Sequence, residues 1–236
     1  MLIVLPLVLA FIAISQKTRN RKLNKKVVNS WSRLLCFVCG LKLTTKGEIH
    51  KNPVFIVANH VSWLDIPVIH SYKLAGFVAK AEIAQWPILG WIVKSGETLF
   101  ITRGKHESRK RVLSLIKNRL AQGRSIAVFP EGKVTDGSHV AQFHRQLMHA
   151  AIETNTPIQA IAIKYIKGDD DNRNKEVCFQ GKESFIKNVF RILSLHSSMV
   201  ELTFCETIQT TKLSAREIAL FSHNQIAQVL AKNDYL

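Results

Sequence analysis

Short apolar runs alternate with amphipathic stretches along most of this chain. After Gly47, six such runs have the length and the β-branched or aromatic content of strands. They are PVFIVA at 53–58, GFVA at 76–79, TLFI at 98–101, SIAVF at 125–129, IQAIAIKY at 158–165 and VELTF at 200–204. Between several of them the apolar positions recur at helical spacing. This alternation predicts an α/β domain with a mostly parallel sheet flanked by helices.

Two helices are predicted with defined ends. Residues 112–120 place apolar side chains at helical spacing, and Gly123 is a plausible stop before the next strand. Near the end of the chain, Ser214 and Glu217 form a capping-box pair before an apolar-periodic helix that runs to about Leu230. The 236 residues contain no internal repeat or low-complexity linker, so we expect one domain with short additions.

The first residues of the chain differ from the rest. Residues 1–16 carry no charge, but their apolar run falls short of the ~20 residues that cross a bilayer comfortably. Basic residues follow the run, which favours a retained anchor, spanning or interfacial, over a cleaved secretory signal. They also put the rest of the chain at the cytoplasmic face of the cell membrane. A second apolar stretch, Trp31–Leu43, is expected to lie flat in the interface. The alternative is that both segments are core helices.

Charge and cysteine content narrow the class of protein. The net charge of +16 indicates a polyanionic partner: nucleic acid, an anionic membrane surface, or phosphorylated and CoA-bearing substrates. The interleaved aromatics of an RNA-recognition sheet and zinc-finger spacing are both missing from the sequence, which argues against nucleic acid. Cys36 and Cys39 form a C-x-x-C pair in an apolar stretch, with no second close pair. Buried thiols in a reduced protein are favoured over a metal or redox site.

Polar residues that could do chemistry gather where the strand at 53–58 ends. Asn59, His60, Ser62 and Asp65 follow it directly. Ligands of open α/β sheets bind outside the carboxyl ends of strands, where a histidine can act as a base and a carboxylate can orient its ring. Residues five apart on a helix are separated by about 140° around its axis. His60 and Asp65 can therefore pair only if His60 lies in the turn before the helix. The alternative is that Asn59 and Ser62 cap the helix and His60 is a satisfied turn histidine.

Two further strands end in polar residues. FPEG at 129–132 predicts an irregular turn, fixed by proline and glycine, that leaves Glu131 at the edge of the sheet. FITR at 100–103 ends in Arg103, whose guanidinium can hold a phosphate with two hydrogen bonds. The alternatives are a solvated surface glutamate and a surface arginine.

Together, these segments resemble the glycerolipid acyltransferase superfamily, the group of 1-acylglycerol-3-phosphate and lysophospholipid acyltransferases. NHVSWLD resembles its N-H-x₄-D block, FITR its second block, FPEG its third and TPIQAIA around Pro157 its fourth. The resemblance extends from about Leu41 to Leu230, and Lys80 matches a lysine common in these proteins. Lys133 and Val134 stand where many members have threonine followed by arginine or threonine, which leaves the acceptor headgroup open.

The resemblance implies an O-acyltransferase in which His60 deprotonates the acceptor hydroxyl, Asp65 supports His60, and the hydroxyl attacks a thioester directly. Its implied substrate-binding residues are Asn59, Ser62, Lys80, Arg103, Glu131 and Gly132. The implied donor is acyl-CoA or acyl-acyl carrier protein, and the acceptor is a lysophospholipid such as 1-acylglycerol-3-phosphate or another lysolipid such as lyso-ornithine lipid. Neither a metal nor another cofactor is implied.

The composition of the N-terminal segments and the resemblance together divide the chain into membrane-associating helices at 1–45, which would contact a membrane surface, and an acyltransferase domain at 46–236. For the tetrahedral oxyanion, backbone N–H groups near the His60 turn are the expected donors. The alternative from another class is a non-enzymatic, basic module that binds membrane or nucleic acid. The sequence does not indicate an oligomeric state.

Overall fold

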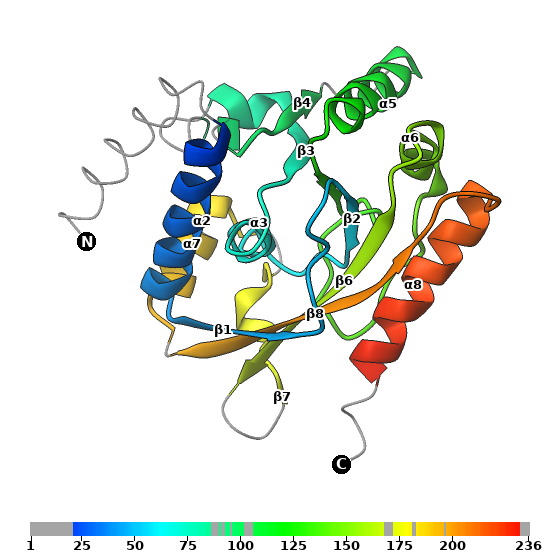
Figure 1. The fold of residues 1–236 in the computed structure, drawn as a ribbon. Helices are drawn as coiled ribbons and strands as arrows, with labels where there is room; N and C mark the ends of the chain where they lie inside the picture. Colours follow the sequence, from blue (N-terminus) through cyan, green and yellow to red (C-terminus); the bar gives the residue numbers. More distant parts are fainter. Residues whose placement is uncertain are drawn as a thin grey trace.

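The computed structural model describes residues 21–85, 90, 93–94, 96–101, 106–167, 172–180, 183–195 and 197–231. They form three layers, a central sheet with helices on both faces (Figure 1). The helices are α2 (Arg21–Val38), α3 (Asp65–His70), α5 (His106–Ala121), α6 (Met148–Glu153), α7 (Phe185–Leu193) and α8 (Ala215–Ala231), with 3-10 turns η1 (Ala81–Gln85), η2 (Arg145–Leu147) and η3 (Lys175–Val177). The strands are β1 (Leu41–Lys46), β2 (Phe55–Ala58), β3 (Gly76–Lys80), β4 (Leu99–Ile101), β5 (Ile126–Val128), β6 (Ile158–Lys167), β7 (Asn172–Arg173) and β8 (Ser198–Ile208).

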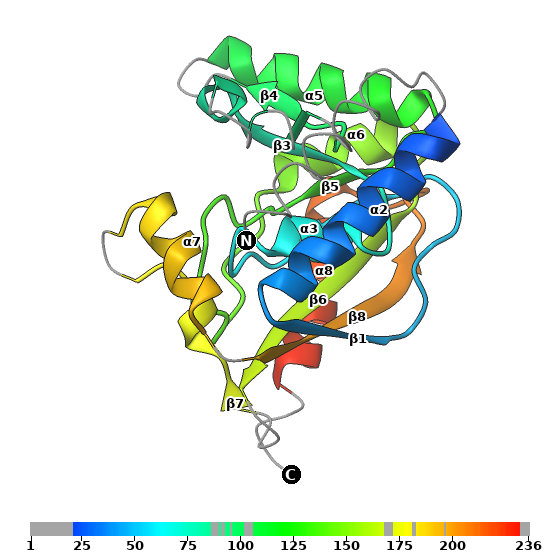
Figure 2. The same cartoon turned by 90° about the vertical axis from the view of Figure 1, so that its left-hand side faces the viewer.

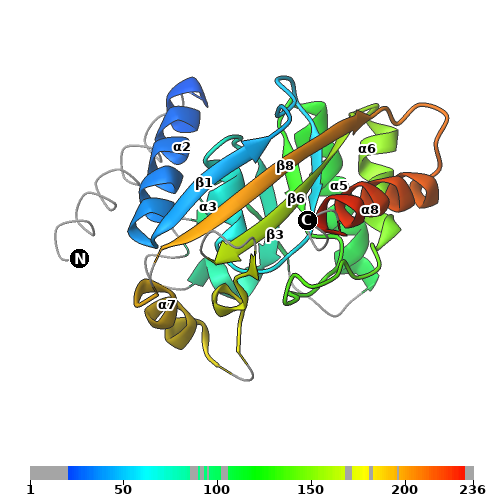
Figure 3. The same ribbon diagram turned by 90° about the horizontal axis from the view of Figure 1, so that it is seen from below.

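The eight-stranded sheet is mostly parallel, as the sequence predicts. Its order is β1-β8-β6-β2-β5-β3-β4, and β7 pairs with β6. Strand β2 lies between β6 and β5 and runs parallel to both. The antiparallel pairs are β6 with β8 and β6 with β7, and Figure 3 shows β1, β8 and β6 side by side. All six predicted strands are present.

Side chains of β2 alternate between two hydrophobic cores, because successive residues of a strand point to opposite faces of the sheet. Ile56 and Ala58 pack with residues of α2, α3 and α7, whereas Phe55 and Val57 pack with residues of α5, α6 and α8. All four are fully buried. Such burial contributes about 1.5–3 kcal/mol for each large apolar side chain. Cover on both faces explains why the central strands read as continuous apolar runs.

The two helices with predicted ends are confirmed. Helix α5 ends at Ala121, and Gly123 follows with a φ of 67°, which a glycine adopts without strain. At the start of α8, the backbone N–H of Ser214 donates to Glu217 Oε2 at 2.8 Å, and the N–H of Glu217 donates to Ser214 Oγ at 3.3 Å. This reciprocal pair is the predicted capping box.

The stretch Trp31–Leu43 does not form one helix. Helix α2 ends at Val38, Gly40 takes a φ of 71°, and from Leu41 the chain is extended and runs parallel to β8. The expectation of an interfacial helix through Leu43 is therefore wrong for its last residues, and the boundary expected between residues 45 and 46 falls inside β1.

Helix α2 itself packs across α3 on one face of the sheet (Figure 2). Its Val27, Val28 and Cys36 are buried, whereas Leu23, Leu34 and Phe37 are exposed. One side of the helix therefore packs on the domain, and contact of the other side with a membrane stays a prediction. Burial raises the pKa of Cys36 to about 12 and that of Cys39 to about 11, as expected for inert thiols. Among the described residues, no helix combines the length and the apolar character needed to cross a bilayer. The predicted anchor at residues 1–16 lies outside them.

Candidate active site

His60 lies in the turn between the end of β2 and Asp65, the first residue of α3. Its Nδ1 is 2.8 Å from Asp65 Oδ2. The imidazole stacks on the ring of Phe129, with centroids 3.9 Å apart and planes within 7° of parallel. The side chain of His60 is 19% exposed, and that of Asp65 is fully buried. The predicted pairing is thus present, and it meets the condition that His60 precede the helix.

Asp65 is held by donors from both sides. Its Oδ2 also accepts the backbone N–H groups of Val61 at 2.7 Å and Ser62 at 3.0 Å, while Oδ1 accepts the hydroxyl of Tyr165 at 2.8 Å. Burial, together with the neighbouring Asp65, raises the pKa of Tyr165 well above its usual value, so the phenol stays protonated as a donor. A carboxylate with this many donors is fixed in place.

The fixed carboxylate determines which nitrogen of His60 is free to accept a proton. The hydrogen-bond geometry assigns the Nδ1–H to Asp65, and Nε2 then carries the lone pair. A neutral imidazole in this tautomer can take a proton from a hydroxyl that reaches Nε2. The pair can therefore perform the base chemistry that the sequence suggested.

The backbone of His60 is clamped by the loop after β5. Glu131 Oε1 accepts the His60 N–H at 2.8 Å, and Oε2 accepts the N–H of Ala141, also at 2.8 Å. Thr135 donates its backbone N–H to the His60 carbonyl at 2.8 Å and its hydroxyl at 3.2 Å. Burial raises the pKa of Glu131, and the two backbone N–H bonds oppose that shift. The solvated-glutamate alternative is wrong, since Glu131 is only 4% exposed.

Gly132 makes this clamp possible. Its φ is 71°, a conformation that side chains disfavour, and an added Cβ would lie 3.3 Å from His144 Cδ2. The turn at Gly132 brings the Glu131 carboxylate within hydrogen-bond distance of the His60 N–H.

Asn59 and Ser62 also serve the turn. The Asn59 amide group donates to the Ile163 carbonyl at 3.0 Å and accepts its N–H at 2.8 Å, which ties the end of β2 to β6. Ser62 Oγ accepts the N–H of Leu64 at 3.4 Å. Both residues are buried, at 1% and 0% exposure. Asn59 therefore ties two strands together and does not cap α3 as the alternative expected, and the predicted contact of either residue with substrate stays a prediction.

The other predicted binding residues are placed less completely. Lys80 ends β3 opposite Ile101 of β4, and its side chain lies outside the described part of the structure. Arg103 also lies outside it. Their roles stay predictions. Within the described ranges, no group of three or more His, Cys, Asp or Glu residues could hold a metal ion.

The expected oxyanion donors are already engaged. The N–H groups of His60, Val61 and Ser62 donate to Glu131 or Asp65. The expectation that the His60 turn supplies free N–H groups is therefore wrong for these three. Sequence reasoning also missed Tyr165 and Thr135. The sequence marks Tyr165 only as the end of a predicted strand, and nothing local to Tyr165 or Thr135 signals a contact with the His60 turn.

Comparison with known proteins agrees with the motifs. The Acyltransferase family pattern matches residues 40–164. The lyso-ornithine lipid O-acyltransferase of Pseudomonas aeruginosa is 33% identical over 201 residues, which cover 84% of this chain and 75% of that protein. The 1-acyl-sn-glycerol-3-phosphate acyltransferase of Neisseria gonorrhoeae is 30% identical over 149 residues, 63% of this chain and 57% of that protein. This second match thus spans little more than half of that relative.

A solved structure shares the fold. The crystal structure of the 1-acyl-sn-glycerophosphate acyltransferase of Thermotoga maritima has a TM-score of 0.75 and is 19% identical in sequence, over 96% of this chain and 88% of that one. At this identity the likeness shows the fold alone. The match of the family pattern to more than half of the sequence, together with the Pseudomonas relative, shows that this chain belongs to the glycerolipid acyltransferase family.

Proposed function

We propose that this acyltransferase moves a fatty acyl group from acyl-CoA or acyl-acyl carrier protein to the free hydroxyl of a lysolipid, with His60 as general base. The observation that carries the proposal is the 2.8 Å contact between His60 Nδ1 and a fully buried Asp65, which leaves Nε2 to accept a proton. Asp65 orients the ring and stabilises the imidazolium that forms.

The proposed reaction proceeds by direct attack. His60 Nε2 removes the proton from the acceptor hydroxyl as its oxygen attacks the thioester carbonyl. The tetrahedral intermediate collapses with cleavage of the carbon–sulfur bond, and the thiolate leaving group takes up the proton from the imidazolium. An ester and a free thiol result, and His60 returns to its neutral form. The sequence has no G-x-S-x-G nucleophile elbow, which agrees with a route that needs no acyl-enzyme.

Two acceptors are supported by the relatives. The Pseudomonas protein, named for lyso-ornithine lipid, matches over 84% of this chain. The Neisseria protein, named for 1-acyl-sn-glycerol-3-phosphate, matches over 63%. The broader match favours lyso-ornithine lipid as the first acceptor to test, with 1-acylglycerol-3-phosphate as the second.

We further propose that the enzyme works at the cytoplasmic face of the cell membrane, with residues 1–16 as its anchor. The support is the uncharged, apolar composition of this segment, the basic residues that follow it, and a substrate class that resides in membranes.

The test is acyl transfer by the purified, folded protein. Labelled acyl-CoA and labelled acyl-acyl carrier protein would each be offered with lyso-ornithine lipid, 1-acylglycerol-3-phosphate and other lysolipids. We expect a labelled diacyl product with at least one acceptor. Failure of every acceptor to become labelled would reject the proposed activity, and release of free fatty acid alone would indicate a hydrolase.

The role of His60 is tested by His60→Ala. Loss of the base should lower kcat by roughly 10² to 10⁴ while the fold is kept, because general base catalysis typically contributes that much. His149→Ala is the matched control, since His149 is exposed on α6. Turnover by His60→Ala at the rate of the control would exclude His60 as the base.

A further inference from the structure

Helix α7 directs two of its largest apolar side chains outward. Ile186 and Phe190 lie one turn apart on the same side of the helix and are 65% and 61% exposed. Lys187 beside them is also exposed, whereas Asn188 is fully buried. A helix on the surface of a soluble domain ordinarily turns its apolar face to the core and its polar face to water. Packing within the domain therefore does not account for the outer face of α7.

The inner face of α7 is bound to the catalytic turn. Asn188 Oδ1 accepts the indole N–H of Trp63 at 2.9 Å, and the ring of Phe185 meets that of Trp63 edge to face, with centroids 5.7 Å apart. Trp63 stands between His60 and Asp65 in the sequence. Because α7 contacts Trp63, an interaction that fixes the position of α7 also fixes the segment that carries His60 and Asp65.

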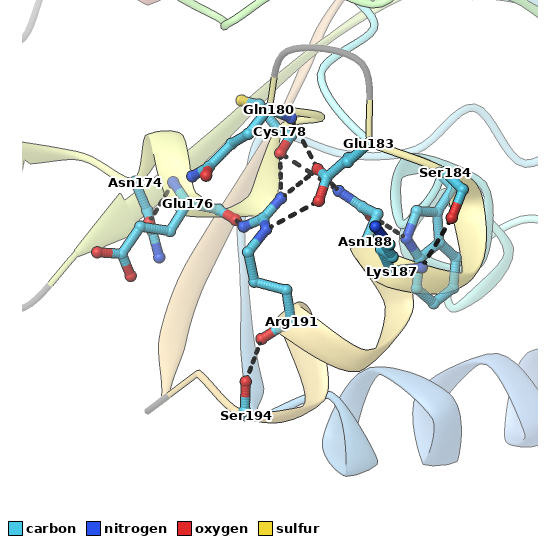
Figure 4. A network of polar contacts seen from close by, with 11 residues as sticks. Asn174, Glu176, Cys178, Gln180, Glu183, Ser184, Lys187, Asn188, Arg191 and Ser194 are labelled. Atoms are coloured by element: carbon cyan, nitrogen blue, oxygen red, sulfur yellow. Dashed lines mark hydrogen bonds and ion pairs between the residues drawn. The ribbon is translucent and has the colours of Figure 1, made fainter.

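A polar network makes this connection rigid (Figure 4). Asn188 Nδ2 donates to Glu183 Oε1 at 2.7 Å, and Arg191 Nη2 donates to the same carboxylate oxygen at 2.6 Å. Arg191 also donates to the carbonyls of Cys178 and Glu176. The ion pair of Arg191 with Glu183, whose side chains are 23% and 13% exposed, thus joins α7 to the residues that precede it.

We propose that the outer face of α7, formed by Ile186, Lys187 and Phe190, docks on the surface of a bilayer that contains anionic lipid. Apolar side chains beside a lysine are the features that seat a helix in the headgroup region, and the net charge of +16 favours an anionic surface. Docking at α7 holds the catalytic turn next to the lipid. The inference rests on the proposed function, because a lysolipid acceptor would be drawn from that surface.

The chain provides an internal control for exposed apolar residues. Leu220 and Phe221 on α8 are 54% and 45% exposed. Helices α7 and α8 lie on opposite sides of the molecule (Figures 1 and 3). Exposed apolar residues are common on soluble proteins, so a response at α7 that α8 does not share would indicate docking at α7 and not non-specific adsorption of apolar side chains.

The experiment uses an environment-sensitive thiol-reactive fluorophore on the full-length chain. It is attached to Ile186→Cys or, as the control, to Leu220→Cys, and vesicles of phosphatidylethanolamine and phosphatidylglycerol are added with or without a nitroxide-labelled phospholipid. Background labelling of the unsubstituted chain is subtracted. It should be slow, because burial raises the pKa of Cys178 and of Cys205 to about 11 and leaves little thiolate.

We expect the label at position 186 to shift to shorter wavelength and to be quenched by the nitroxide lipid, while the label at position 220 does neither. Quenching at neither site, or equally at both, would overturn the proposal. A response at position 186 to acidic acyl carrier protein but not to vesicles would also overturn it and would assign this face to the donor. The readout requires no acyl transfer, so docking and the proposed activity can fail independently.

A kinetic test complements the fluorescence. In the double variant Ile186→Ser/Phe190→Ser, the apparent KM for an acceptor embedded in vesicles should rise by about tenfold, because two side chains no longer leave water on docking. The KM for a short-chain, monomeric acceptor should stay within about twofold, as should both values in Leu220→Ser/Phe221→Ser. An unchanged KM on vesicles in the α7 variant would contradict the proposal.

Discussion

Asp65 accepts four hydrogen bonds from two parts of the chain: from the His60 imidazole and two backbone N–H groups of its own turn, and from the phenol of Tyr165 on β6. In Asp65→Asn, the amide supplies one acceptor oxygen and directs N–H groups at some of these donors. The His60 ring then loses the partner that fixes its tautomer, and kcat should fall by roughly 10³ to 10⁴. Steady-state kinetics at neutral pH would measure this loss.

Tyr165→Phe is the matched control for that prediction. It removes only the donor to Oδ1 and leaves the His60 contact in place, so kcat should fall far less than in Asp65→Asn. The free energy of unfolding should drop by about 1–3 kcal/mol, since a buried, charged acceptor loses one partner. Equal losses of kcat in the two variants would mean that the Nδ1 contact is not the one that orients the base.

The buried His70, at the end of α3, should make the free energy of unfolding depend on pH. Burial lowers its pKa from the ordinary 6.5 to about 4, and Nε2 lies 2.8 Å from the Ala75 carbonyl. Between these two pH values the folded protein binds fewer protons than the unfolded chain. The free energy of unfolding therefore falls as the pH drops from 6.5 toward 4, by on the order of 3 kcal/mol. Denaturant titrations of His70→Gln should show a flatter profile in this window, whereas the exposed His149→Gln should keep the slope. An unchanged slope in His70→Gln would refute this assignment.

The pairing of His60 with Asp65 could be predicted because the two residues lie near each other in the sequence. His60 and Asp65 lie within one turn, and the geometry of a helix start specifies how they can meet. Tyr165 lies 100 residues from Asp65, and Thr135 lies 75 residues from His60. Their contacts depend on β6 and the loop after β5 flanking the end of β2. The order of the strands in the sheet cannot be inferred from any local sequence pattern. The contacts of Tyr165 and Thr135 with the turn are therefore seen only in the structure.

Among the elements, the strands with an apolar run were predictable, the edge strand β4 included, whereas the edge strand β1 was not. Central strands are apolar on both faces, which makes them conspicuous in the sequence. Strand β1 lies at one edge of the sheet, where only Leu41 is buried and Leu43 half-buried, while its lysines and threonines face outward. Its residues therefore lack an apolar run of their own, and Leu41–Leu43 read as the end of the preceding apolar stretch. The register with β8 could not be inferred from either strand alone.

The start of α8 offers a test confined to one element. Ser214→Ala removes the hydroxyl that accepts the Glu217 N–H and donates to its carboxylate. The free energy of unfolding should fall by about 1 kcal/mol, the usual cost of losing an N-cap. Because α8 and the His60 turn pack against opposite faces of the sheet, kcat should not change. Chemical denaturation and kinetics of Ser214→Ala and of Ser197→Ala, an exposed serine outside any helix, would test both statements. If Ser197→Ala lowered the free energy of unfolding by the same amount, loss of the helix cap would not explain the effect of Ser214→Ala.

At the scale of the molecule, three adjacent parallel strands bring the parts of the proposed site to one end of the sheet. The end of β2 carries His60, the loop after β5 carries Glu131, and β6 carries Tyr165. This convergence follows the general rule that open α/β sheets bind ligands beyond the carboxyl ends of their strands. The site is therefore built on the most buried part of the fold, whereas the proposed lipid contacts lie at its periphery, in α7 and residues 1–16.

The two proposed lipid contacts differ in kind, and this difference provides a test on the whole protein. Leu9→Lys puts a charge within the uncharged run of residues 1–16. A lysine in the middle of an inserted segment costs about 2.5–3.5 kcal/mol, so partitioning onto vesicles should weaken by roughly a hundredfold. Leu220→Lys on α8 is the control and should bind as the unsubstituted chain does.

Binding that remains in Leu9→Lys would come from α7 and the positive surface. The electrostatic part of that share should decrease steeply with salt, since the attraction of a protein of charge +16 to anionic headgroups is screened within about 8 Å at physiological ionic strength. The part that comes from burying Ile186 and Phe190 should not. The share from residues 1–16 rests on removing apolar surface from water, and moderate salt should leave it nearly unchanged. Vesicle flotation of both variants across a salt series would separate the two contributions. Equal flotation of Leu9→Lys and the unsubstituted chain at every salt concentration would exclude residues 1–16 as the anchor.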